Sequence, residues 1–112
     1  MDRLRQCLPE MRYLYHHLKP NKRSNYVKYG SVTLVECLTN VALNLMYSNK
    51  NGIKLTPLQI QNLRKNKRGI VKLIMSEDVK TKRKILNNKL IEVLLSTLMD
   101  IAEDLDFDGQ DL

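Results

Sequence analysis

Apolar residues recur at helical spacing along most of the chain. Over residues 2–18, large apolar side chains are separated by alternating steps of four and three, which is the spacing of one helix face. Pro9 interrupts this stripe because proline lacks an N–H, so the helix is expected either to begin there or to kink there. Residues 19–30 are polar and basic and predict a connection. A second helix is expected over about 32–48, with Ser31 as its N-cap.

The strongest start signal for a helix lies at Thr56. Thr56 can cap the helix, Pro57 occupies its first position, and Gln59 completes a capping box. This third helix is expected to end near Met75. Its apolar residues fall on one face, and a ridge of cations runs beside them, with Lys67 lying within the apolar stripe. The ridge consists of Arg64, Lys65, Arg68 and Lys72.

A fourth helix is expected from about Val79 to Leu105, long or broken near Asn87–Asn88, after an acidic turn that favours a helix start. Seven-residue repeats on this helix form an apolar seam typical of helix packing. No stretch has the alternation of a strand. We therefore predict an all-α, single-domain bundle of about four helices over residues 1–105, with an acidic flexible tail at 106–112. The seam consists of Ile91, Leu94, Leu98, Ile101 and Leu105.

Charge is unevenly distributed along the 112 residues. The chain has 19 Lys and Arg against 12 Asp and Glu, a net charge of +7. Residues 1–89 hold all 19 cations and five acids, giving +14, whereas residues 90–112 hold seven acids and no cation, giving −7. This asymmetry favours a polyanionic partner, with the acidic end able to shield the basic part.

Basic residues of the third helix and of the start of the fourth suggest contacts with nucleic acid. Many modest contacts to phosphates would give binding without base readout, because each neutralised phosphate releases counterions. Tyr26 and Tyr29, interleaved with cations, are candidates for stacking on unpaired bases. Helix-turn-helix readout is disfavoured, because Glu77 and Asp78 occupy the end of the helix that would approach the bases. The predicted phosphate contacts are Arg64, Lys65, Lys67, Arg68, Lys72, Lys80, Lys82, Arg83 and Lys84.

Catalytic and metal-binding patterns are missing from the sequence. His16 and His17 are adjacent, so they point about 100° apart on a helix, and with the cysteines they have no zinc-ligand spacing. We predict no enzyme activity, metal or cofactor. Cys7 and Cys37 are too few for a disulfide framework and are expected to be reduced and buried in an intracellular protein, with a bridge between them left open. No secretory leader or membrane-spanning run is recognised.

The stretch LTPLQIQNLRKNKRGIVKLI, followed by KTKRKIL, resembles small basic proteins of Maverick/Polinton-type elements and adintoviruses. The resemblance covers about residues 34–86 and implies a nuclear or virion-associated accessory protein, similar to core proteins that compact a genome. After Leu86 the chain departs from the family's Gly-Gly-Phe motif and apolar tail. The matching positions are Leu55, Thr56, Gln59, Leu63, Arg64, Lys65, Lys67, Lys80, Lys82, Arg83, Lys84, Ile85 and Leu86.

Two functions are therefore open from the sequence. The first is nonenzymatic, sequence-nonspecific binding of nucleic acid, with DNA favoured over RNA. In the second, the protein is an interaction module that binds a partner helix, or a second copy of itself, through residues 91–105. The basic pair Lys67–Arg68 and the basic run Lys80–Lys84 also have the spacing of a bipartite nuclear import signal.

Overall fold

The computed structural model describes the backbone of residues 2–50 and 52–110, and the side chains of residues 4–50 and 52–102. Within these residues the regular structure is helical and contains no strand, which confirms the all-α prediction. The described part holds seven helices, so the prediction of about four was too low. They are α1 (Asp2–His17), α2 (Pro20–Tyr29), α3 (Val32–Met46), α4 (Pro57–Lys65), α5 (Lys67–Met75), α6 (Val79–Ile85) and α7 (Asn88–Gln110).

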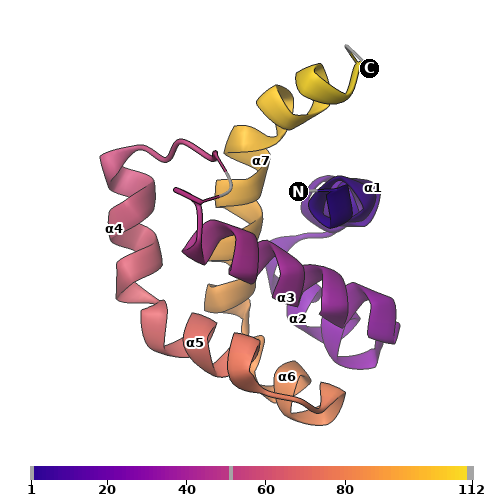
Figure 1. The fold of residues 1–112 in the computed structure, drawn as a ribbon. Helices are drawn as coiled ribbons and strands as arrows, with labels where there is room; N and C mark the ends of the chain where they lie inside the picture. The colour runs from indigo at the N-terminus through magenta and orange to yellow at the C-terminus, as the bar shows by residue number, and fades with distance from the viewer. Residues whose placement is uncertain (1, 51, 111–112) are drawn as a thin grey trace.

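Helices α3 and α7 form the centre of the fold (Figure 1). Helix α3 contacts α1, α5, α6 and α7, while α7 contacts α1, α2, α3 and α4. Most core side chains come from α1, α3 and α7, and burying them supplies the main driving force for folding. The large side chains with almost no exposure are Leu4, Met11, Leu14, Val27, Leu34, Leu38, Leu45, Leu73, Ile91, Leu94, Leu95 and Leu98.

The first helix agrees with the sequence prediction in extent, and the second was not predicted. Helix α1 continues through Pro9, so it does not begin there. Pro9 is exposed, whereas Leu8 and Met11 on either side of it are buried, and this packing holds the helix across the lost backbone hydrogen bond. Residues 20–29 form α2 rather than a connection, with Pro20 at its first turn. Val27 is the one apolar side chain that α2 buries, so no apolar stripe marked this helix in the sequence.

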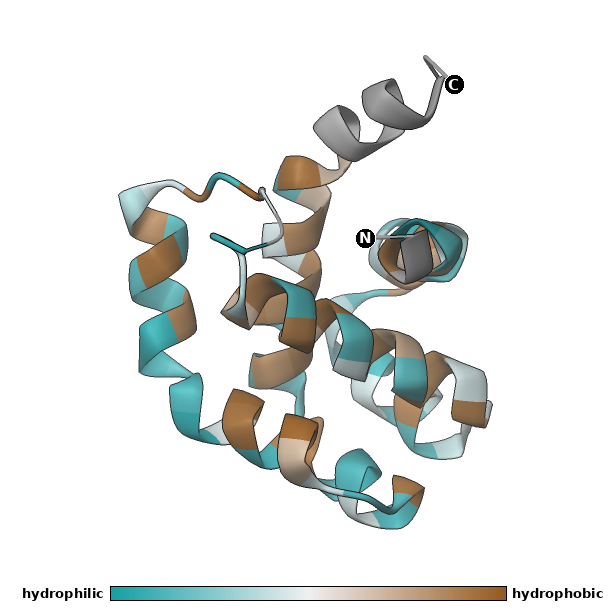
Figure 2. Ribbon diagram, in the orientation of Figure 1, coloured by the Kyte–Doolittle hydropathy of each residue, from teal (hydrophilic) through white to brown (hydrophobic). Residues whose placement is uncertain are grey.

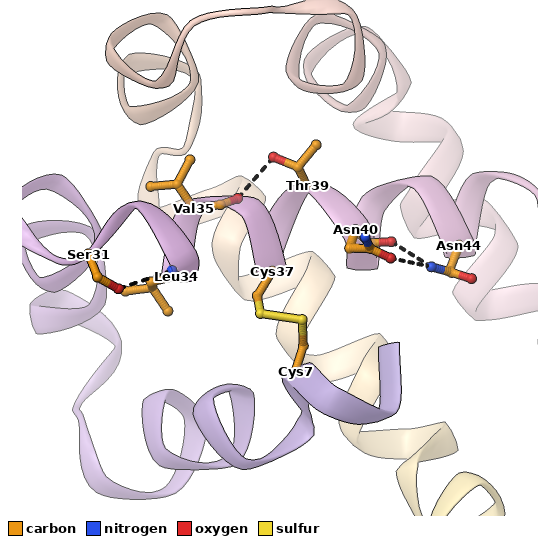
Figure 3. Close-up of a disulfide and its surroundings, with 8 residues drawn as sticks. All are labelled: Cys7, Ser31, Leu34, Val35, Cys37, Thr39, Asn40 and Asn44. Carbon is orange, nitrogen blue, oxygen red and sulfur yellow. Dashed lines mark hydrogen bonds between the residues drawn. A yellow bond between two sulfur atoms is a disulfide. The ribbon is translucent and has the colours of Figure 1, made fainter. Parts of the chain in front are cut away.

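A disulfide joins α1 to α3, and the expectation of two reduced thiols is therefore wrong (Figure 3). Cys7 and Cys37 have Cα atoms 5.5 Å apart, within the range that a disulfide spans. Both residues face the α1–α3 contact and are nearly buried. Sequence spacing could not reveal the bridge, because the two cysteines are 30 residues apart and meet only through the packing of α1 against α3. The bridge also removes the argument from free thiols for an intracellular location.

The predicted third helix is two helices that meet at Asn66. Its capping box is confirmed, since Gln59 N–H donates to Thr56 Oγ1 at 3.2 Å and Thr56 N–H donates to Gln59 Oε1 at 2.8 Å. Asn66 leaves helical geometry at φ −108° and ψ 13°. A straight helix would place Lys67 in the apolar stripe. The break instead leaves Lys67 exposed while Ile70 of α5 is buried.

The predicted fourth helix is broken near Asn87, which was one of its two expected forms. Asp78 caps α6 by accepting from Thr81 N–H at 2.9 Å, and Asn87 Oδ1 accepts from Leu90 N–H at 2.8 Å in the first turn of α7. Leu86, between the two helices, is buried and holds the bend. Helix α7 includes residues 106–110, which the sequence predicts to be a flexible tail, and the side chains of that segment lie outside the described residues.

Candidate nucleic-acid interface

The nine cations predicted to contact phosphates lie on three consecutive helices. Helices α4 and α5 carry five of them, and α6 carries the other four. Seven are exposed, while Lys82 and Arg83 are half-buried. Figure 2 shows hydrophilic residues on much of α4 and α6. We call the set formed by Arg64, Lys65, Lys67, Arg68, Lys72, Lys80, Lys82, Arg83 and Lys84 the basic face.

The carboxylates of the described residues leave the basic face unpaired. The ion pair found among those residues joins Arg23 to Glu92, and no member of the basic face is within 4.0 Å of a described carboxylate. Asp78 is the acid whose charge interacts with Lys80 and Lys84. Hydrogen bonds from the Thr81 hydroxyl and from its backbone N–H, aided by these two lysines, lower the pKa of Asp78. Asp78 is thus held as a helix cap.

Arg83 is committed in part to holding the fold. Its Nη1 donates to the backbone oxygens of Val27 at 2.7 Å and of Lys28 at 3.0 Å. These carbonyls belong to the last turn of α2, where no further helix residue can satisfy them. Arg83 therefore fixes α6 against the carboxyl end of α2 in addition to any contact with a ligand.

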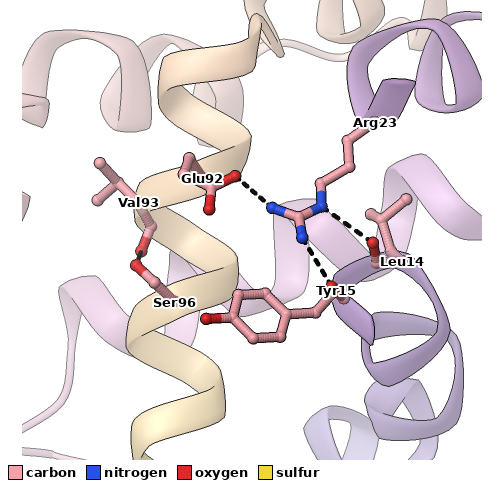
Figure 4. A network of polar contacts seen from close by, with 6 residues as sticks. All are labelled: Leu14, Tyr15, Arg23, Glu92, Val93 and Ser96. Atoms are coloured by element: carbon pink, nitrogen blue, oxygen red, sulfur yellow. Dashed lines mark hydrogen bonds and ion pairs between the residues drawn. The ribbon is translucent and has the colours of Figure 1, made fainter. Parts of the chain in front are cut away.

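Arg23 is buried, although the sequence groups it with exposed cations of residues 22–28. Its Nε donates to Leu14 O at 3.0 Å, its Nη2 donates to Tyr15 O at 2.6 Å, and its Nη1 pairs with Glu92 (Figure 4). The guanidinium also lies 4.9 Å from the centroid of the Tyr15 ring. Arg23 thus joins the end of α1 to α7 and is not available to phosphates.

The two tyrosines proposed for stacking have different surroundings. Tyr29 is 78% exposed, with the Lys28 Nζ 5.6 Å from its ring centroid. Tyr26 is 41% exposed and its ring packs against that of Tyr13 at 5.8 Å, while Tyr13 stacks on His17 at 5.2 Å. Tyr29 is therefore the freer of the two for stacking, and the Tyr13 contact was not apparent from the sequence.

The apolar seam of α7 is part of the protein's own core. Ile91, Leu94 and Leu98 have no exposed surface, and Ile101 is 7% exposed. Leu105 lies outside the residues whose side chains are described. A partner helix could reach the described seam only by displacing α1 and α3, which pack against α7. The surface that the interaction-module hypothesis requires is thus already covered within one chain.

Two hollows adjoin the basic face. One, of about 310 Å³, lies between α3, α4 and α5, with Arg64 and Lys67 in its lining. The other, of about 460 Å³, lies between α2 and α6 and brings together polar residues that are more than 50 positions apart. Sequence reasoning missed the second hollow because α2 was not recognised as a helix. It is lined by Ser24, Asn25, Lys28, Lys80, Arg83, Lys84 and Leu86.

Several other observations bear on function. In the described part of the chain, no group of three or more His, Cys, Asp or Glu residues is placed to hold a metal ion. No helix there is long and apolar enough to cross a bilayer. The proposed import signal lies in α5 and α6, whereas import receptors bind an extended peptide.

Comparison with protein-family models, curated proteins and solved structures finds no match for this chain.

Proposed function

We propose that this protein is a nonenzymatic nucleic-acid-binding protein that contacts the phosphate backbone and does not read base sequence. The observation that carries the proposal is the basic face, where nine cations occupy three consecutive helices without a carboxylate partner among the described residues. Like charges on neighbouring helices repel one another, and a phosphate polymer relieves that repulsion.

The proposal predicts steep dependence on salt. Arg83 already donates its Nη1 to two carbonyls of α2, so we count only the other eight cations of the basic face as full phosphate contacts. With about eight neutralised phosphates, log K should fall with log salt at a slope of about −7 on duplex DNA. A slope near zero would show that the basic face only solvates the protein.

Charge reversal on the basic face tests the proposal directly. Fluorescence anisotropy with a random 30-base-pair duplex would compare the native protein with the triple variant Arg64→Glu, Arg68→Glu and Lys72→Glu. A control that reverses Lys19, Lys50 and Lys54, which are exposed cations elsewhere, matches the change in net charge. We expect the basic-face variant to lose binding at 100 mM salt and the control to retain most of it. Equal loss in both would contradict a localised interface.

We further propose DNA as the natural polymer and genome compaction, in the nucleus or virion of a virus-like or mobile element, as the cellular role. Support comes from the resemblance of residues 34–86 and from a binding mode that any sequence can satisfy. Light scattering of kilobase-length DNA titrated with the protein tests compaction. Competition between duplex DNA and duplex RNA of one sequence tests the choice of polymer.

A further inference from the structure

The hollow between α2 and α6 has the composition of an anion site. Lys28 comes from α2, and Lys80, Arg83 and Lys84 come from α6, so four cationic side chains line one hollow. A hydroxyl from Ser24 and an amide from Asn25 add neutral donors. Among the residues whose side chains are described, no carboxylate lines the hollow. We call this hollow the α2–α6 pocket.

The fold holds the α2–α6 pocket in place. The two carbonyls that Arg83 contacts use Nη1, so its Nε and Nη2 are left to donate to a ligand. Lys80 and Lys84 are four residues apart and share one face of α6. Leu86, the C-cap of α6, is buried and also lines the pocket. Arg83 would therefore meet an anion from a position that the fold already fixes, which lowers the entropic cost of its contact.

We propose that the α2–α6 pocket binds a phosphate group with two or more negative charges, as in a phosphate monoester or a polyphosphate. An internal phosphodiester carries one charge, whereas a terminal phosphate carries about −1.5 to −2 at pH 7 and presents three acceptor oxygens. Four cations that line one hollow match the charge of the terminal group better. Asp78 offsets one of these charges from the start of α6, and its bonds to Thr81 keep it engaged as a cap.

The α2–α6 pocket shares Lys80, Arg83 and Lys84 with the basic face, so the inference partly rests on the proposed function. It adds a local site to a diffuse surface. Two sources of the ligand are consistent with the same chemistry, namely the terminal phosphate of a nucleic-acid strand and a free polyphosphate. Each is tested by its own probe.

Sodium tripolyphosphate tests the pocket itself. Calorimetric titration at 150 mM salt would compare the native protein with a pocket variant, Lys28→Gln and Lys84→Gln. The control, Lys65→Gln and Arg68→Gln, removes the same charge from α4 and α5, away from the pocket. Circular dichroism verifies that both variants fold. We expect at least a tenfold loss of tripolyphosphate affinity in the pocket variant and less than a twofold loss in the control.

Single strands of 12 nucleotides, with a 5′-phosphate or a 5′-hydroxyl, test the strand end. Preference for the phosphorylated strand that disappears in the pocket variant assigns the ligand to a strand terminus. Equal binding of both strands, with tripolyphosphate still lost only in the pocket variant, assigns the pocket to free polyphosphate.

Each proposal can fail separately. Equal loss of tripolyphosphate in the pocket variant and the control overturns the pocket, and the duplex experiment still judges the basic face. Conversely, tripolyphosphate binding that needs the pocket, in a protein that binds no duplex, overturns the proposed function and leaves the pocket standing.

Discussion

Replacing Arg23 with methionine should destabilise the fold far more than replacing its acidic partner. Methionine keeps most of the volume of the arginine side chain and removes every N–H donor of the guanidinium. The carbonyls of Leu14 and Tyr15 would then lose their partner at the end of α1, where the helix itself supplies none. Glu92, by contrast, is 42% exposed and can be solvated by water.

The expected loss in the free energy of unfolding follows from the number of hydrogen bonds that Arg23 makes and from how exposed each one is. Hydrogen bonds to a charged group contribute about 1.5–3 kcal/mol each, and two of them, discounted because the effects are not additive, give a loss of about 3 kcal/mol. The pair with Glu92 is open to solvent on one side, so Glu92→Gln should cost under about 1 kcal/mol.

Urea unfolding followed by circular dichroism measures both variants. With an m-value of about 1.5 kcal/mol/M, Arg23→Met should lower the midpoint by about 2 M and Glu92→Gln by less than about 0.7 M. If Arg23→Met lowers the free energy of unfolding by less than about 1 kcal/mol, or by the same amount as Glu92→Gln, Arg23 does not stabilise the fold mainly through the carbonyls of α1.

Three further predictions concern stability. Reducing the Cys7–Cys37 bridge, which spans 30 residues, should lower the free energy of unfolding by about 3.6 kcal/mol in the chain-entropy model, measured by urea unfolding with and without reductant. Thr56→Ala should cost about 1 kcal/mol through loss of the capping box, measured by thermal unfolding against an exposed Thr33→Ala control. The lowered pKa of Asp78 means that its stabilising effect is present above the ordinary carboxyl pKa and is lost as pH falls through the folded value. Asp78→Ala should therefore destabilise the protein at pH 7 and do so less and less as the pH falls below the ordinary carboxyl pKa, measured by urea unfolding at a series of pH values.

How far the sequence predicts this fold depends on how local each signal is. The Thr56 capping box and the break near Asn87 are set by neighbouring residues, and both are found as expected. Helix α2 was missed because it buries Val27 and Arg23 and has no apolar stripe to reveal it. The Cys7–Cys37 bridge was missed because it depends on the packing of α1 against α3.

The candidate site also combines features that neighbouring residues determine with features that only tertiary packing determines. Exposure of Arg64, Lys65, Arg68 and Lys72 follows from their place beside an apolar stripe, so the sequence identifies these residues. Lys67 lies within that stripe in the sequence and is exposed because the helix breaks at Asn66. The burial of Arg23 and the contact of Arg83 with Val27 depend on where α1 and α2 end in space. The α2–α6 pocket is lined by residues of 24–28 and of 80–86, and only the tertiary fold brings these two segments together.

Helix α4 has no buried residue, and this has a consequence for its motion. Few apolar contacts hold it, so its amide protons should exchange with solvent sooner than those of α3 or α7. Transient opening would let Arg64 and Lys65 follow the curvature of a bound polymer while the central helices stay closed. A segment held weakly to the body of the molecule would then act as an adjustable arm, and ligand binding should slow its exchange.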